Sequence, residues 1–473
     1  MNKLFRTAGL CFFLTTAAQA EAIKLELGEY LHQVVAEHKG IQGAHDISTG
    51  AALRSSEGSL ILYPNLFSTI QLGTDEKPTS STAFQGTKSS ANLYSLGITQ
   101  LTTFGLQAKL SYNLNYYDIT GANRTFVPEP TYYDGKAQVE LTQSIWRNGF
   151  GREVRAAQEL FEAQALATSY AEKFKATVTI AEAETIYWRL ALARETVAIQ
   201  QETLARSVKI LEWNQRRVNL QLADKVDLLQ AEAALQARKL ELQAAQDEER
   251  SAMTAFNTFR GRDSDVVVEG LTRPDPNFVS SLSVPPRDEL RDDVKAAKEQ
   301  TRVAISAAKV GREKALPNLD LFASYALNGR DTATGPTFSE SFTTQFPTKA
   351  IGLRLSIPLG FGTISNVREG YGLEANAAEM IYERKRFEQD REWNDLVIRF
   401  KESKGRLELA ETIQSAQRAK LMHERDRLNR GRTTTFQVLS FEQDYATAQL
   451  GFVRAETEVL RISAQLKTFG GGQ

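Results

Sequence analysis

Apolar and polar residues alternate one by one in four segments of the chain, which is the period of a β-strand whose two faces meet different surroundings. In the clearest segment, 106–116, the apolar positions are Leu106, Ala108, Leu110, Tyr112, Leu114 and Tyr116. The other segments are 137–145, 319–327 and 351–357. We therefore expect two β-hairpins, one in each half of the chain.

The first hairpin region, 60–146, is much longer than the second, 317–358. Tyr94, Leu96 and Ile98 add a short alternating stretch inside the first region. The extra length predicts a long outside loop or a small accessory hairpin, and six spanning strands in the chain stay open as an alternative.

A helical period occupies most of the remaining sequence. No proline occurs between Pro130 and Pro274 or after Pro358, and Ala, Glu, Gln, Leu and Arg dominate there, as in long helices. A helix from about Arg152 to Leu220 would be roughly 100 Å long at 1.5 Å per residue. Its heptad-like seam is rich in alanine, which lets helices approach closely: Leu160, Ala163, Ala167, Tyr170, Phe174, Thr177, Ala181, Glu184, Trp188 and Ala191.

The second half of the chain repeats the first at a separation of about 210 residues, which indicates a duplicated structural unit. Segment 51–66 parallels 310–319, 141–151 parallels 353–362, and 219–232 parallels 429–442. Each unit predicts a helix, a proline that starts a strand (Pro64, Pro317), and a glycine break between strand and long helix (Gly149 and Gly151, Gly360 and Gly362).

These patterns divide the chain into eight segments. They are a signal peptide (1–20), the first N-terminal helix (21–59), the first hairpin region (60–146), the first long coiled helices (147–261), an equatorial linker with a short strand at Val266–Val268 (262–287), the second repeat helix (288–316), the second hairpin (317–358) and the second long coiled helices (359–473).

The N-terminus has the pattern of a secretory signal, with Lys3 and Arg6 before an apolar stretch and a small-residue cleavage site ending at Ala20. The only cysteine, Cys11, lies within it, so the mature chain is expected to have no thiol or disulfide. No later stretch approaches the ~18 apolar residues of a transmembrane helix. A secreted chain of this kind would meet a membrane through β-strands.

The composition and short motifs give little indication of a binding or catalytic site. The formal charge of −1 indicates no nucleic-acid partner. The four histidines include no i, i+4 pair, and no phosphate loop or nucleophile motif is present. We expect no cofactor, no metal and no enzymatic activity.

The chain resembles the TolC-type outer-membrane efflux protein family. The segments that carry the resemblance are Arg291–Ala297 leading to Ala315–Leu319, Leu141–Trp146 followed by Gly149–Gly151, and Asp227–Glu232. The resemblance implies a mainly α fold with a transmembrane β part: a homotrimer whose twelve-stranded β-barrel continues into a periplasmic α-helical barrel. Geometry agrees that one chain is not enough, because four strands are fewer than the ~8 of the smallest transmembrane barrels.

The resemblance also implies the function. The chain would be the outer-membrane exit duct of a tripartite efflux or type I secretion system in a Gram-negative cell, extending into the periplasm. It would passively conduct substrates received from an inner-membrane RND or ABC pump and a periplasmic adaptor, and it would contact outer-membrane lipid.

The gate of such a duct lies, in the family, where the inner helices turn at the periplasmic tip. Here those turns hold Asp227, Gly431 as a hinge, Arg432, Gln437 and Ser440. Well-known members carry aspartates at the positions of Gln437 and Ser440, so the family's acidic ring is missing. We hypothesise a closed-state tie between Arg432 and Asp227; the alternative is that both are ordinary solvated turn residues.

Three other folds or functions are alternatives. A soluble β-sandwich would bury the apolar strand faces. A structural or adhesive coiled-coil trimer would use the strands as a head without a pore. A periplasmic adaptor is a third alternative. The sequence does not indicate the substrate, the pump type or the adaptor.

Overall fold

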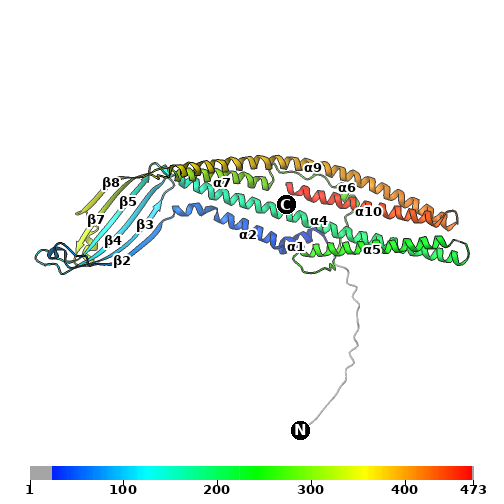
Figure 1. The fold of residues 1–473 in the computed structure, drawn as a ribbon, viewed down its shortest axis with the longest axis horizontal. Coiled ribbons are helices and arrows are strands. Elements are labelled where there is room, and N and C mark those ends of the chain that lie inside the picture. Colours follow the sequence, from blue (N-terminus) through cyan, green and yellow to red (C-terminus); the bar gives the residue numbers. More distant parts are fainter. Residues whose placement is uncertain (1–23, 223, 471–473) are drawn as a thin grey trace, which may run out of the picture. The chain divides into compact units, whose positions relative to one another are not determined.

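The computed structural model describes residues 24–222 and 224–470, and the predicted signal peptide with its Ala20 site lies outside them. Two compact units are present, and Figure 1 shows their elements. The sheet unit comprises residues 44–174 and 289–391. The helical unit comprises, within the described part, residues 24–43, 175–288 and 392–470.

The sheet unit contains one antiparallel sheet of six strands in the order β2-β3-β4-β5-β7-β8. The strands are β2 (Asn65–Asp75), β3 (Lys88–Leu101), β4 (Leu106–Thr120), β5 (Thr131–Ser144), β7 (Asn318–Asp331) and β8 (Pro347–Ser356). The prediction of a long outside loop or a small accessory hairpin in the first region is therefore wrong, because that region holds four full strands, and the sheet has the six strands of the alternative. Ser68 on the apolar face of β2 weakens its alternation, which hid this strand in the sequence.

The two faces of the sheet differ as the alternation predicts. Ile70 pairs with Tyr94 and Tyr94 with Leu114 on the apolar face. On the opposite face, Ser95 donates a 2.7 Å hydrogen bond to Asn113. Ile70 is 69% exposed, and no second sheet among the described residues covers the apolar face, which argues against a soluble sandwich.

The loops at the far end of the strands carry two short helices that the sequence did not predict, α3 (Thr82–Gln85) and α8 (Thr334–Glu340). The helix α8 packs over Gly135 and Gly329, which are partners in the sheet register. A Cβ at Gly329 would lie 2.5 Å from the Thr337 carbonyl oxygen, so the glycine pair makes room for the helix.

The helices follow the predicted order. They are α1 (Leu27–Glu37), α2 (Lys39–Arg54), α4 (Arg152–Asn219), α5 (Lys225–Phe259), α6 (Pro276–Ser281), α7 (Asp292–Lys314), α9 (Phe361–Asn429) and α10 (Thr435–Leu466), with 3₁₀ turns η1 (Ser55–Leu62), η2 (Gly149–Gly151) and η3 (Lys467–Phe469). The segment expected as one N-terminal helix is broken at His38, whose Nδ1 accepts a 3.3 Å bond from the Ile41 amide and so caps α2.

Aromatic residues form the centre of the helical unit. The Tyr30 and Phe256 rings stack with centroids 4.1 Å apart, and Tyr187 packs beside them. The Tyr187 hydroxyl donates to the Leu25 carbonyl at 2.8 Å, which ties β1 (Lys24–Leu25) to this core. Such burial of large aromatic side chains contributes strongly to stability.

The equatorial segment differs from its prediction. The strand lies at β6 (Gly270–Leu271), which pairs in parallel with β1, and Val266–Val268 is irregular. Arg194 explains the difference, since its guanidinium donates to the carbonyls of Val267 and Glu269 at 2.6 Å each. The Arg194 side chain therefore satisfies backbone carbonyls that a neighbouring strand would otherwise have to satisfy.

The junctions between strands and helices use the predicted prolines and glycines unequally. Pro64 and Pro317 immediately precede β2 and β7. Gly151 has a φ of +82°, and a Cβ there would lie 1.9 Å from the Thr103 carbonyl oxygen. In the second repeat, Gly360 precedes α9, Gly362 lies in its first turn, and a Cβ at either would meet open space.

Replacing Gly151 and Gly362 by alanine should therefore have opposite effects. Gly151→Ala should lower the free energy of unfolding by about 3 kcal/mol, because it strains a left-handed backbone and displaces the Thr103 turn. Gly362→Ala should raise it by about 0.5–1 kcal/mol, since alanine favours a helix. Thermal unfolding of the purified proteins measures both, and equal shifts for the two variants would contradict this account.

Candidate gate at the helical tips

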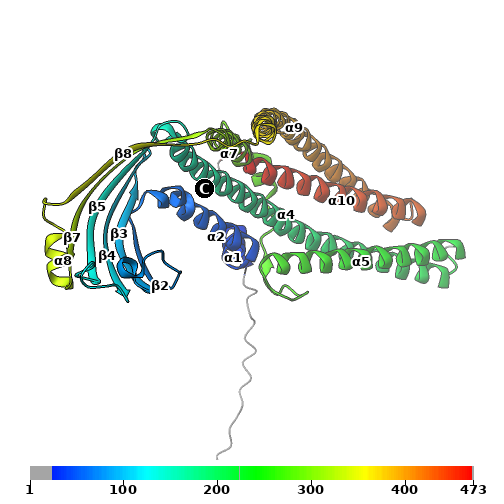
Figure 2. The ribbon, with the colours of Figure 1, turned by 60° about the vertical axis from the view of Figure 1, so that its left-hand side comes forward.

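Both tip turns have the same backbone. After α4, the Leu222 amide donates to the Arg217 carbonyl at 2.8 Å and Gln221 to Val218 at 2.9 Å. After α9, Arg432 donates to Arg427 at 2.8 Å and Gly431 to Leu428 at 2.9 Å. This is the Schellman arrangement of a helix end, and it confirms that the two tip segments are structural repeats. Figures 1 and 2 show both turns at the same end of the helical unit.

The turns differ in the residue that takes the left-handed conformation. Gly431 does so with a φ of +67°, whereas Gln221 does so with a φ of +58°. The role of Gly431 as a hinge stays a prediction. The helices that follow begin in the same way, because the side chains of Asp224 and Thr434 accept hydrogen bonds from amides of α5 and α10.

The predicted gate residues lie in or just after these turns, but Asp227 and Arg432 of the same chain do not contact each other. Asp227 is half-buried in the first turn of α5, and the Arg432 side chain is exposed. The described residues contain no ion pair between them. Gln437 and Ser440 are half-buried on α10, where the Gln437 amide donates to the Thr434 hydroxyl at 3.3 Å. A tie between Arg432 and Asp227 of different chains stays a prediction.

A charged cluster behind the turns connects three helices instead. The Glu442 carboxylate on α10 is 2% exposed and accepts from Arg206 of α4 at 2.9 Å and from Arg425 of α9 at 2.9 Å. Arg206 also donates to the Thr203 hydroxyl at 2.8 Å. We call Arg206, Arg425 and Glu442 the tip clamp.

Further polar contacts hold the fourth helix and the ends of the turns. Arg238 of α5 is buried and donates to Gln443 of α10. Thr435 donates to the buried Asn214 side chain at 2.7 Å. The apolar core between them is small, consisting of Ile210, Ala231, Leu428 and Val438. Polar contacts therefore carry much of the cohesion of the tips.

The tip clamp was not predicted from the sequence, although a signal was present. Glu442 lies in the buried stripe of α10 between Val438 and Ala446, at helical spacing, so a charge occupies a core position. Its counterpart in the first repeat, Glu232, is exposed. A carboxylate in an apolar stripe needs a cation nearby, and Arg206 and Arg425 supply it.

A second carboxylate of the same stripe is buried without a hydrogen bond. Glu456 is 0% exposed, and neither of its oxygens has a hydrogen-bond partner. Arg273 approaches it at 3.9 Å but pairs with Glu195 at 3.0 Å. Burial raises the pKa of Glu456 from its ordinary 4.5 to about 7, Arg273 lowers it, and Glu195 and Glu411 raise it further.

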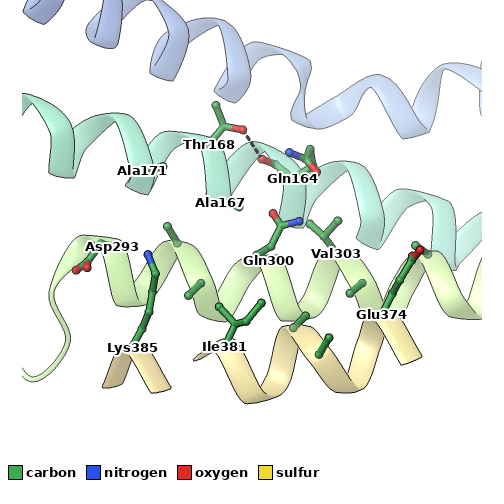
Figure 3. Close-up of a pocket in the computed structure, with 16 residues that line it drawn as sticks. Gln164, Ala167, Thr168, Ala171, Asp293, Gln300, Val303, Glu374, Ile381 and Lys385 are labelled. Atoms are coloured by element: carbon green, nitrogen blue, oxygen red, sulfur yellow. Dashed lines mark hydrogen bonds between the residues drawn. The ribbon is translucent and has the colours of Figure 1, made fainter. Parts of the chain in front are cut away.

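The helices of the sheet unit form an alanine-lined groove of about 630 Å³ between α4, α7 and α9. Figure 3 shows Gln164 of α4 and Gln300 of α7 within it, with Lys385 of α9 near Asp293. Ala163 and Ala167 of the predicted seam are buried, so the small side chains allow close helix contacts.

The described residues contain no group of three or more His, Cys, Asp or Glu side chains placed to hold a metal ion. No helix in this part of the chain combines the length and apolar character needed to cross a membrane.

Comparison with known proteins places these features in context. The model of the family described as "Outer membrane efflux protein" matches residues 288–472. No curated protein matches the chain in sequence.

Several solved outer-membrane channels share the fold. They are CmeC of Campylobacter jejuni (13% identity, 93% of this chain and 84% of that one, TM-score 0.68), VceC of Vibrio cholerae (15%, 94% and 96%, 0.66) and the open state of MtrE of Neisseria gonorrhoeae (16%, 94% and 89%, 0.65). The fold thus extends over nearly the whole chain, including the first half that the family model does not match.

Removing the charge of the tip clamp should loosen the tips. Glu442→Gln removes the buried carboxylate that Arg206 and Arg425 share and leaves Arg206 only its exposed partner Glu202 at 3.2 Å, so it should destabilise the region by about 3 kcal/mol. Hydrogen exchange of α10 amides around residue 442 should then accelerate by about a hundredfold. The control is Glu388→Gln, which breaks the exposed Arg384–Glu388 pair and should cost at most about 0.5 kcal/mol. Similar exchange in both variants would exclude a clamp.

Stability should depend on pH through Glu456. Because its pKa is higher in the folded state, folding binds a proton between pH 4.5 and about 7, and stability falls as pH rises through that window. The loss should be about 3 kcal/mol and should then level off. Glu456→Gln should remove this loss, whereas Glu411→Gln, on an exposed neighbour, should keep most of it. Urea unfolding at pH 5 and pH 8 measures the difference, and an unchanged pH dependence in Glu456→Gln would refute it.

Proposed function

We propose that this chain is the exit duct of a tripartite export system, and the match of residues 288–472 to the model of the outer membrane efflux protein family supports the proposal. The family confirms the recognition made from the sequence and the expected location in the Gram-negative outer membrane, extending into the periplasm. The fold of outer-membrane efflux channels, with its long helices, is likewise established.

The two-faced sheet is the observation that carries the proposal. Each strand carries exposed apolar side chains on one face, while Ser95, Asn113 and similar polar residues line the other face. Lipid on one side and water on the other would satisfy both faces, as in the wall of a membrane channel. The expected homotrimer gives each chain two neighbours with which to close that wall.

The duct would conduct passively, and its partners would supply the energy. An inner-membrane RND or ABC pump would load substrate, and a periplasmic adaptor would dock its helical hairpin in grooves near the tips, a helix-in-groove mode. Exposed apolar residues near the turns, Leu229 and Phe436 among them, offer contact area for such a helix.

Gating would act at the tips. The tip clamp joins α4, α9 and α10 inside one chain, while Asp227 and Arg432 leave their side chains available to neighbouring chains. With Gln437 and Ser440 in place of aspartates, an acidic ring at that level would be absent, so strong cation selectivity is not expected there.

The alternative is a structural or adhesive trimer of the cell envelope without a pore. The exposed apolar sheet face speaks against a water-exposed head domain, since large exposed apolar patches mark contact surfaces. The alanine-lined groove also differs from the large apolar seam of a fibrous coiled coil.

Extraction of outer membranes in detergent should give an oligomer that conducts ions in planar bilayers. Native mass measurement determines the number of chains, and single-channel recording determines conductance. Asp227→Ala should increase that conductance if Asp227 ties Arg432 of a neighbouring chain in the closed state, and Asp224→Asn, at an adjacent cap, serves as control. A non-conducting monomer would contradict the proposed duct. Unchanged conductance in Asp227→Ala would contradict only the proposed contact between Asp227 and Arg432 of neighbouring chains.

A further inference from the structure

The hairpin of β3 and β4 joins β3, which the two-hairpin expectation lacked as a full strand, to β4, which it contained. The two strands have 14 and 15 residues, whereas β5 and β7 each have 14. They pair with each other and with β2 and β5 along their lengths. The hairpin is therefore as long as the strands that lead into the helices.

The turn of this hairpin is built into the junction between sheet and helix. Thr102 and Leu106 exchange hydrogen bonds across the turn at 3.0 and 3.1 Å. The Phe104 carbonyl accepts from Gln143 of β5 at 3.2 Å. Gly105, with a φ of +80°, lies so close to Gly151 that a Cβ would be 2.9 Å from its amide nitrogen. The hairpin thus spans the full height of the sheet.

The same two faces continue through the hairpin. Tyr94, Leu96 and Ile98 are 39–55% exposed on the apolar face, and Leu110 beside them is 57% exposed. Ser95, Ser111 and Asn113 lie on the polar face. A hairpin outside the membrane would gain nothing from an exposed apolar face, so β3 and β4 belong to the wall.

The sheet ends in two unpaired edges. Within the described residues, β2 and β8 each have one strand neighbour. Apolar side chains on both strands are largely exposed: Ile70 is 69% and Ile351 77% exposed. Backbone groups of an open edge have no partner in hydrocarbon, so each edge needs another strand. Because β2 leaves the helices and β8 returns to them, β2 of one copy and β8 of the next would pair antiparallel.

We propose that three copies of this six-stranded sheet close a barrel of eighteen strands in place of the expected twelve, an inference that rests on the proposed trimeric duct. Barrels of 16–18 strands enclose an aqueous channel, wider than that of a twelve-stranded wall. The membrane section of this duct would then admit larger solutes, and size selection would fall to the helical tips.

The polar face is built to leave such a channel open. The Phe67 ring lies against Gly97, where a Cβ would be 2.6 Å from it, and the Phe322 ring lies against Gly352 at the same distance. Lys109 sits 5.1 Å from the first ring and Arg354 5.5 Å from the second. Both aromatic rings fold onto the sheet beneath a cation, so they line the wall and do not fill the lumen.

Cysteine cross-linking of the full-length protein tests the pairing of the edges. The only native cysteine, Cys11, lies in the predicted signal peptide, so any disulfide in the mature protein must form between introduced cysteines. Ile70→Cys on β2 is combined in turn with Lys349→Cys, Ile351→Cys or Leu353→Cys on β8. One register should give disulfide-linked ladders ending at three chains. The matched control, Ile70→Cys with Tyr94→Cys, joins register partners inside one chain and should give only monomers.

Native mass and polymer exclusion complete the test. We expect a mass of three chains and entry of polyethylene glycols, added from the outer side, that a twelve-stranded channel of the family excludes. A mass of two chains, a β2–β8 disulfide inside one chain, or a trimer without any β2–β8 cross-link would overturn the eighteen-stranded barrel. Loss of conductance with the three-chain ladder intact would count against the exit duct only, because the ladder does not depend on conduction.

Discussion

Backbone hydrogen bonding is the constraint on which the rest of this structure depends. Six strands satisfy one another along their lengths, but the outer edges of β2 and β8 have no strand beside them in the described part of the chain. Water cannot replace the missing strand inside a hydrocarbon layer, so the sheet needs further copies before it can lie there. The ends of the strands in turn determine where the helices end and begin: β2 and β7 start directly after Pro64 and Pro317, and α4 starts after the Gly149–Gly151 turn.

The helical unit is held together by two different kinds of interior. Around Tyr30, Tyr187 and Phe256 the core is large and aromatic, and β1 and β6 are tied into it. Toward the tips the apolar core shrinks to a few residues, and charged and amide side chains connect the four helices. Polar contacts are directional, and they lose most of their stabilising free energy when one partner moves. An aromatic core cannot separate without exposing a large apolar surface to water. The end proposed to open is thus the end with the smaller apolar core.

Sequence periodicity predicted the long helices, four of the six strands and the matching tip turns, because in these elements one face differs strongly from the other. It failed where a local contact overrides the pattern. Ser68 interrupts the apolar face of β2, His38 caps a second helix within an expected single one, and Arg194 replaces the strand expected at Val266–Val268. The clamp at Glu442 needed knowledge of which helices meet, since Arg206 is 236 positions away in the sequence.

Duplication gave the two halves the same backbone and left the side chains free to diverge. The tip turns share their hydrogen bonds, yet the left-handed position is a glycine in one half and Gln221 in the other. An L-residue in that conformation is strained by about 1 kcal/mol or more, so the first turn keeps a geometry that its sequence does not favour. Glu232 is exposed where Glu442 is buried, and α10 also holds Glu456. Both buried carboxylates therefore lie on α10, in the second half, and they distinguish its helical hairpin from that of the first half.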